Sequence, residues 1–117
     1  MVQSFVSLNV HIIFSTKYRQ PLLTPEVEVP LFKYFNRVLE TEGCPSLALG
    51  CSDDHVHVLT ELSRTLAISK LVEQLKSNSS RWAKRRLGLS DFSWQRGYSA
   101  FAVSKHAVGR VRMYVLN

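Results

Sequence analysis

Apolar and polar residues alternate from position 6 to position 15, and this period of two is typical of a strand with one buried face. The apolar positions that share the predicted buried face are Val6, Leu8, Val10, Ile12 and Phe14. The other face is polar and includes His11, and only Ile13 interrupts the alternation. A half-buried strand is not stable alone, so the chain is expected to build a sheet.

Helical spacing replaces the alternation after a basic, aromatic loop. Apolar residues recur at this spacing between position 27 and position 39. Thr24 can cap the predicted helix, Pro25 suits its first position, and Gly43 can end it. Pro30 lies inside the segment, where it lacks a backbone donor and crowds the preceding turn. It therefore predicts a kink or a late start.

The rest of the chain predicts, in order, a hairpin, a helix, a strand and a helix. Turn-forming residues at 52–54 join the two short runs of the hairpin. The predicted segments are 47–51 and 55–61 for the hairpin, 67–87 for the helix, 94–103 for the strand with a bulge at Gly97, and a last helix that follows the cap Ser104 and runs to Asn117.

This order of elements favours an α+β fold of the ferredoxin-like kind. We expect a mainly antiparallel sheet of about four strands with helices packed on one face and a final helix that carries Tyr114. A length of 117 residues fits one domain, and no linker or repeat divides residues 1–117.

The composition, 45% hydrophobic and 21% charged, is that of a globular fold with a core. No run approaches the roughly 18 apolar residues that indicate a membrane span, and the N-terminus lacks the features of a signal peptide. We therefore expect a cytoplasmic protein. Cys44 and Cys51 form no metal or disulfide motif and are expected to be reduced thiols. No Gly-rich phosphate loop is present, which argues against a nucleotide cofactor.

The charge indicates a polyanionic partner, because 15 Lys and Arg against 9 Asp and Glu give a net charge of +6. Two basic segments that contain an aromatic residue are candidates for nucleic-acid contact. They are the loop Lys17, Tyr18 and Arg19, and the helical set Lys76, Arg81, Trp82, Lys84, Arg85 and Arg86. A solvated helix face with Trp82 in the core explains the second set equally well.

Two of the four histidines stand one residue apart in the stretch CSDDHVHVLTEL. Because side chains alternate along a strand, His55 and His57 point to one face and can reach a single metal ion. Asp53 and Asp54 precede the pair, where a carboxylate can ligate the metal or hold an imidazole. Such a site favours Mg or Mn in a phosphate reaction and Zn in a hydrolytic one. Two partly exposed histidines on an open sheet face are the simpler interpretation of the spacing.

Tyr114 is the candidate nucleophile, and it lies near Arg110 and Arg112 on the last predicted helix. A phenol with a pKa of about 10 is a weak nucleophile until a cation or metal stabilises the phenolate. The alternative is a tyrosine that packs its ring on the core and leaves the hydroxyl at the surface. Tyr98 is the rival nucleophile, but its predicted strand position favours a base-stacking or core role. His11 can neighbour the site, although a structural role is favoured for it.

Five segments, taken in order, carry a family resemblance: HIIFSTKYRQPLL, DDHVHVLTEL, ISKLVEQLKSNSSRWAKRR, WQRGYSAFAVS and VGRVRMYVLN. Together they resemble the small single-tyrosine transposases of the His-hydrophobic-His (HUH) superfamily, which occur in short insertion sequences and in REP-associated relatives. The resemblance covers nearly the whole chain.

The resemblance implies a DNA transposase that uses Mg or Mn, acts on single-stranded DNA as a homodimer, and recognises hairpins at the ends of its element. His55 and His57 become metal ligands by this resemblance. Tyr114 becomes the nucleophile that leaves a 5′-phosphotyrosine and a free 3′-hydroxyl. The predicted DNA contacts, taken from the two basic segments and the last helix, are Lys17, Tyr18, Arg19, Lys76, Arg81, Arg85 and Arg110.

One position departs from the family pattern. The family places a metal-binding glutamine four residues after the tyrosine, which here falls at position 118, beyond Asn117. Asn117 or Asp54 can offer the third ligand instead, or the ligand lies outside the present chain. The alternative function is therefore a catalytically impaired or domesticated DNA hairpin-binding protein of the same fold. A zinc hydrolase that uses the same histidines is the third possibility.

Overall fold

The structure, a computed structural model, describes residues 8–117. Val6 and Ser7, at the start of the predicted first strand, lie outside the described residues. The elements, in chain order, are β1 (Leu8–Ser15), the 3₁₀ helix η1 (Lys17–Arg19), α1 (Pro25–Thr41), β2 (Ser46–Cys51), β3 (His55–Leu62), α2 (Ile68–Arg86), β4 (Ser99–Val103) and α3 (Val108–Leu116).

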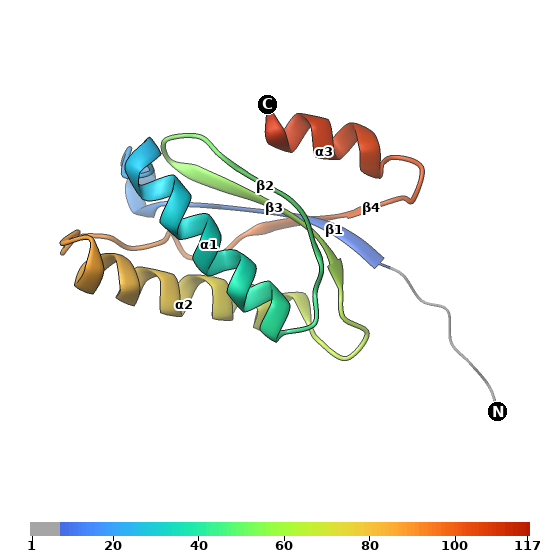
Figure 1. Cartoon of the computed structure of the whole chain (residues 1–117), viewed down its shortest axis with the longest axis horizontal. Helices are drawn as coiled ribbons and strands as arrows, with labels where there is room; N and C mark the ends of the chain where they lie inside the picture. The colour runs from blue at the N-terminus through green and yellow to red at the C-terminus, as the bar shows by residue number, and fades with distance from the viewer. Residues whose placement is uncertain (1–7) are drawn as a thin grey trace.

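The four strands form one sheet in the order β2-β3-β1-β4 (Figure 1). Every neighbouring pair is antiparallel, and β1 lies between β3 and β4. A helix connects β1 to β2 and another connects β3 to β4, with a hairpin between them, so the ferredoxin-like α+β prediction is confirmed. The register places Ile13 opposite His57, and His11 opposite Leu59 on one side and Phe101 on the other.

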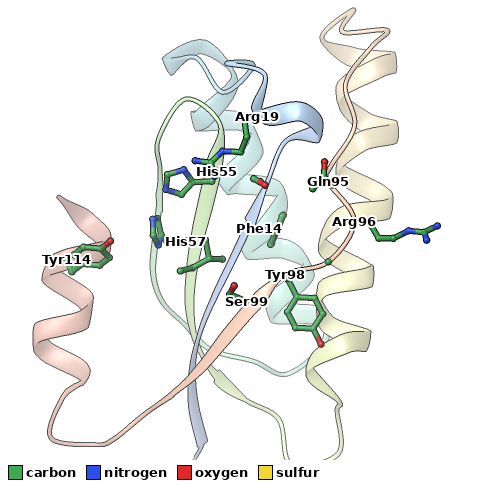
Figure 2. Close-up of a pocket in the computed structure, with 12 residues that line it drawn as sticks. Phe14, Arg19, His55, His57, Gln95, Arg96, Tyr98, Ser99 and Tyr114 are labelled. Atoms are coloured by element: carbon green, nitrogen blue, oxygen red, sulfur yellow. The ribbon is translucent and has the colours of Figure 1, made fainter.

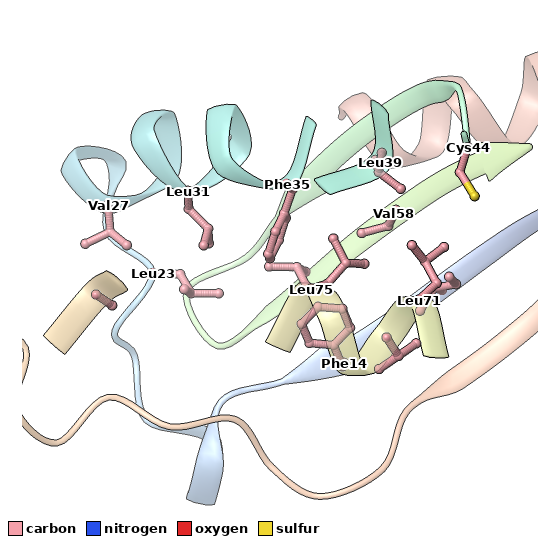
Figure 3. Packing of buried hydrophobic residues seen from close by; sticks show 14 of the residues in the cluster. Phe14, Leu23, Val27, Leu31, Phe35, Leu39, Cys44, Val58, Leu71 and Leu75 are labelled. Atoms are coloured by element: carbon pink, nitrogen blue, oxygen red, sulfur yellow. The ribbon is translucent and has the colours of Figure 1, made fainter. Parts of the chain in front are cut away.

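The main core lies between the sheet and the helices α1 and α2 (Figure 3). The helix α1 contributes a stripe at four-residue spacing that is almost fully buried: Val27, Leu31, Phe35 and Leu39. The helix begins at Pro25 and runs through Pro30, so the predicted late start is wrong. Burial of each Leu or Phe in this stripe contributes about 1.5–3 kcal/mol, which outweighs one missing backbone hydrogen bond early in the helix.

The helix α3 packs on the opposite face of the sheet from α1 and α2 (Figure 1). The prediction that the helices share one face therefore holds only for α1 and α2. A small second cluster fixes α3, in which Val115 packs against Ala48 of β2 and Leu59 of β3. The helix comes so close to β2 that a β-carbon at Gly50 would overlap the carbonyl oxygen of Val115. Glycine at position 50 is thus what lets α3 dock.

The last strand and the last helix are shorter than predicted. The strand β4 begins at Ser99, and Trp94 forms only an isolated bridge with Thr16. Gly97, with φ of 90°, breaks the extended path between them. The helix α3 begins at Val108, because the Ser104 hydroxyl accepts a bond from the Ala107 N–H and closes a separate turn first.

Both cysteines are free thiols, as predicted. Within residues 8–117, no helix has the length and apolar character needed to cross a membrane.

Candidate active site on the α3 face of the sheet

The two histidines of β3 point to the α3 face, as the period of two predicts. His55 and His57 alternate with Val56 and Val58, which are fully buried in the main core on the other face. Their ring centroids lie 4.9 Å apart. Both rings line an open pocket of about 440 Å³ (Figure 2).

His55 is held by a carboxylate. Its Nδ1 lies 2.7 Å from Oδ1 of Asp54, and Arg19 donates from Nε to Oδ2 of the same carboxylate at 3.0 Å. The hydrogen bond from Arg19, and then that from His55, lowers the pKa of Asp54. Both carboxylate oxygens are therefore engaged, and Nε2 is the ring nitrogen of His55 that stays available. The geometry favours Asp54 as the group that orients an imidazole, which was one of its two predicted roles.

His57 is held by a second imidazole. Its Nδ1 lies 2.9 Å from Nε2 of His11 on the neighbouring strand, and the two rings stack at 26°. Burial, followed by the charges of His55 and His11, lowers the pKa of His57 to about 4. At neutral pH the ring is uncharged, which is the form that binds a metal ion.

Tyr114 faces this histidine pair from α3 (Figure 2). Its ring lies 5.6 Å from the ring of His57 and 6.2 Å from that of His11. The side chain is 66% exposed, whereas Val115, the next residue, is buried against the sheet. Docking of one side of α3 thus presents the phenol to the pocket.

Tyr98 lines the same pocket from the segment before β4, and its side chain is exposed. Within the described part of the chain, its ring makes no contact with a histidine ring, in contrast to Tyr114. The exposure excludes the predicted core role, while a base-stacking role remains a prediction.

The histidine pair is not part of a larger metal-binding cluster. No group of three or more His, Cys, Asp or Glu side chains suited to a metal ion occurs within positions 8–117. Asn117 lies at the exposed end of α3, where its Nδ2 donates to the carbonyl oxygen of Met113 at 2.7 Å. The side-chain oxygen of Asn117 is the amide atom that is left to bind a metal ion.

A family model described as "Transposase IS200 like" matches residues 4–117. The chain belongs to the IS200-like transposase family. This confirms the family predicted from the sequence. The segments that carried the prediction, including the His-x-His strand and the Tyr114 helix, all lie within the matched residues.

Two curated relatives are similar to this IS200-like transposase over most of its length. The chain is 26% identical over 111 residues to the transposase of insertion sequence element IS200 from Salmonella typhimurium, with 90% of this chain and 72% of that protein covered. It is 26% identical over 115 residues to the ISDra2 transposase TnpA of Deinococcus radiodurans, with 92% and 81% covered.

Two solved structures are similar to it. One is a crystal structure of a Deinococcus radiodurans R1 transposase, with a TM-score of 0.77, 25% identity, and coverage of 98% of this chain and 94% of that chain. The other is a REP-associated tyrosine transposase bound to a REP hairpin, with a TM-score of 0.68, 14% identity and coverage of 98% and 68%, which shows a shared fold.

The predicted DNA contacts of this IS200-like transposase fall into two groups. Lys17, Tyr18, Arg81, Arg85 and Arg110 have exposed side chains. The ring of Tyr18 is 78% exposed, and its φ of 60° is unusual for a residue other than glycine. The ring is therefore open to solvent, and its role in nucleic-acid contact stays a prediction.

Lys76 and Arg19 are instead engaged within the transposase. Lys76 donates from Nζ to the carbonyl oxygens of Gln95 and Gly97, at 2.8 and 2.5 Å. Burial lowers the pKa of this lysine. Arg19 supports Asp54, as described above, although its exposed edge still lines the pocket. Two of the predicted DNA-binding cations therefore have structural partners.

The sequence did not reveal the contact between His11 and His57. His11 was expected on the polar face of the first strand, and that face is the one that carries the site. The missing information was which strand lies beside it and in what register, because alternation within one strand carries neither.

Proposed function

We propose that residues 1–117 form one catalytic and DNA-binding domain that cleaves and rejoins single-stranded DNA. Tyr114 is the nucleophile, and His55 and His57 are ligands of a divalent Mg or Mn ion. The observation that carries the proposal is the pocket in which the phenol of Tyr114 faces both histidines, with its ring 5.6 Å from that of His57.

The donor set fits a divalent ion that keeps open coordination positions. Two imidazoles have their Nδ1 atoms held by Asp54 and His11, which leaves both Nε2 atoms as ligands. An oxygen from Asn117, or from a residue outside the present chain, would complete the protein ligands, since Asp54 is already engaged. A bound ion would supply positive charge to the non-bridging oxygens of the reacting phosphate.

The chain's own residues provide attack and alignment. The hydroxyl oxygen of Tyr114 gives up its proton to solvent and forms a bond to the phosphorus. The bond from phosphorus to the 3′ oxygen breaks, and the 3′ oxygen takes up a proton from solvent to become the free 3′-hydroxyl. The product is a 5′-phosphotyrosine. Because the new ester keeps the bond energy of the phosphodiester, a DNA 3′-hydroxyl can reverse the step without a nucleotide cofactor.

DNA with a hairpin is the proposed substrate. The net charge of +6 and the exposed cations of the loop, α2 and α3 support binding to a polyanion. One protein of the same fold is described as bound to a REP hairpin.

A homodimer is the proposed assembly, since the edge strand β4 exposes Phe101 (57%) and α3 exposes Met113 (60%). Light scattering of the purified protein tests this assembly.

The decisive experiment detects a covalent intermediate. The protein is mixed with Mn²⁺ and labelled single-stranded oligonucleotides copied from both flanks of its gene, and the products are separated on a denaturing protein gel. We expect a labelled protein band for the wild type and for Tyr98→Phe, and none for Tyr114→Phe or His57→Ala. A band that persists in Tyr114→Phe would exclude Tyr114 as the nucleophile.

A DNA hairpin-binding protein without strand transfer is the second candidate. The observation in its favour is that no complete three-ligand metal group occurs in the part of the chain described by the structure. It predicts hairpin binding that weakens with salt but no labelled protein band with any oligonucleotide or metal.

A further inference from the structure

His11 occupies a buried position at the centre of the α3 face. It is 8% exposed and lies on β1, one of the two central strands of the sheet. Its Nε2 is 2.9 Å from Nδ1 of His57, and the two ring centroids are 5.1 Å apart. The ring centroid of Tyr114 lies 6.2 Å from that of His11, and the two ring planes make an angle of 75°. One side chain thus contacts both residues to which the proposed chemistry is assigned.

We propose that His11 is a positioning residue that fixes the ring orientation and the tautomer of His57 and sets where the Tyr114 ring lies. The inference rests on the proposed role of His57 as a metal ligand. The family resemblance gave His11 no role, and the sequence favoured a structural role for it.

A neutral imidazole carries a proton on only one of its two ring nitrogens, and the other nitrogen can accept a hydrogen bond or bind a metal ion. If His57 offers Nε2 to a metal ion, its proton must be on Nδ1, and a proton in this half-buried place needs an acceptor. Nε2 of His11 is the acceptor at hydrogen-bond distance. His11 must then carry its own proton on Nδ1. With a metal ion on Nε2 of His57, the hydrogen bond can run only from Nδ1 of His57 to Nε2 of His11, and His11 then stabilises the tautomer that binds the metal.

The strand register explains why a residue as long as histidine is needed. His57 is directly opposite Ile13, so His11 reaches it along the diagonal of the two strands. Diagonal neighbours have backbone positions about 7–8 Å apart, a gap that two imidazoles can bridge. Glutamine has a similar reach and can accept a hydrogen bond, whereas phenylalanine fills the space and cannot accept one. These two substitutions separate the hydrogen bond from the packing.

His11 and Asp54 thus have parallel roles with different chemistry. The Asp54 carboxylate contacts Nδ1 of His55, and the His11 imidazole contacts Nδ1 of His57. The contact to Tyr114 adds a second consequence, because a ring at position 11 limits how far the phenol can tilt toward the sheet. The contacts of His11 are with His57 and Tyr114, so its proposed effect passes through these two neighbours.

The test measures Mn²⁺ binding to the DNA-free protein by electron paramagnetic resonance, for wild type, His11→Phe, His11→Gln and His57→Ala. The control is His106→Phe, which removes an exposed histidine from the turn before α3. We expect His11→Phe to weaken Mn²⁺ binding by about 10- to 100-fold, as loss of an orienting partner does. His11→Gln should recover most of the affinity, and His106→Phe should behave as the wild type.

Nitrogen chemical shifts of ¹⁵N-histidine-labelled protein give a second readout without metal. The wild type and His11→Gln should show His57 protonated on Nδ1, and His11→Phe should show a mixture of tautomers. Circular dichroism confirms that each variant is folded.

If His57→Ala weakens Mn²⁺ binding and His11→Phe does not, the positioning role is wrong and the proposed function stands. If His57→Ala itself binds as the wild type does, the ligand assignment fails, and the inference fails with it.

Discussion

The charge state of His57 is set by its surroundings at the level of single atoms. The ring is half-buried between two other imidazoles, and burial, followed by the charges of His55 and His11, lowers its pKa from 6.5 to about 4. Burial also lowers the pKa of His11. A site with three histidines could accumulate protons and repel a cation, and this arrangement keeps His57 neutral well below pH 7.

The stability of the metal-free protein should therefore fall as the pH falls from about 6.5 to 4. In this pH window His57 binds a proton in the unfolded chain but not in the folded protein, because its pKa is about 6.5 when unfolded and about 4 when folded. A lower pH therefore favours unfolding. Urea unfolding in EDTA at pH 7, 5.5 and 4.5 measures the effect, which His57→Gln should reduce. His106→Gln is the control, and the pKa of Asp54, lowered from 3.8, places its titration below the window. Equal pH dependence in wild type and His57→Gln would contradict the pKa of about 4.

Local patterns in the sequence predicted the part of the site that lies within one strand. The period of two within one strand was enough to place His55 and His57 on a common face. It could not reveal that Asp54 is shared between His55 and Arg19, because that contact joins residues 35 positions apart. The contact between His11 and His57 spans 46 positions and depends on the strand register. Non-local pairing is what a single sequence leaves open.

At the scale of elements, the site depends on how α3 docks, and Gly50 controls the docking distance. Gly50→Ala should displace α3, because the added β-carbon would overlap the backbone of Val115 and backbone cannot move aside as a flexible side chain can. A displacement of about 1 Å of a catalytic group can cost roughly 100-fold in rate. We expect the rate of the labelled protein band to fall by about this factor, with the sheet and the α1–α2 core still folded.

The matched control for Gly50→Ala is Gly109→Ala on α3 itself. A β-carbon at position 109 meets no atom within 4 Å, and alanine favours a helix over glycine by about 0.5–1 kcal/mol. Gly109→Ala should therefore keep or raise the rate. If Gly50→Ala forms the covalent band as fast as the wild type, the close approach of α3 to β2 is not needed for activity.

The strand β4 lies within the predicted strand 94–103, but local patterns could not predict where it begins. The apolar pattern up to Val103 resembles a strand from Trp94 onward. The Gln95 N–H still donates to the carbonyl oxygen of Ser15 in β1, and residues 96–98 then leave the sheet. The carbonyl groups of Gln95 and Gly97 accept hydrogen bonds from the Lys76 ammonium of α2 instead of from a neighbouring strand. A tertiary contact thus overrides the strand propensity of this segment.

Lys76→Met should destabilise the protein more than it weakens DNA binding. The substitution removes the donor of two charge-assisted hydrogen bonds, and loss of such bonds costs about 1–3 kcal/mol. The comparison is Lys84→Met, an exposed lysine near the end of the same helix. We expect a lower urea midpoint for Lys76→Met only, with a salt dependence of DNA binding close to that of the wild type. A wild-type midpoint with a reduced salt dependence would instead identify Lys76 as a phosphate contact.

At the scale of the whole molecule, the sheet separates two surfaces. One face carries α3, the histidines and Tyr114, and the other is covered by α1 and α2 (Figure 1). Among the predicted DNA-binding cations, Arg110 lies on the first side, whereas Arg81 and Arg85 lie on α2. Arg81 and Arg85 are one helical turn apart, so they share one side of that helix. A DNA that contacts both sides must pass around an edge of the sheet, as a hairpin with a single-stranded extension could.

Salt titrations with two DNA forms test this division. Each phosphate contact contributes a slope of about 0.9 to the dependence of log K on log salt for duplex DNA, and about 0.7 for single strands. If the hairpin stem lies along α2, Arg81→Ala and Arg85→Ala should each lower the slope by about 0.9 with a hairpin and leave it unchanged with an unpaired oligonucleotide. Lys70→Ala is the control, since Lys70 on the same helix pairs with Glu73 at 3.8 Å. If the slopes with the hairpin do not change, the α2 surface is not where the stem binds, and its cations form only a solvated helix face.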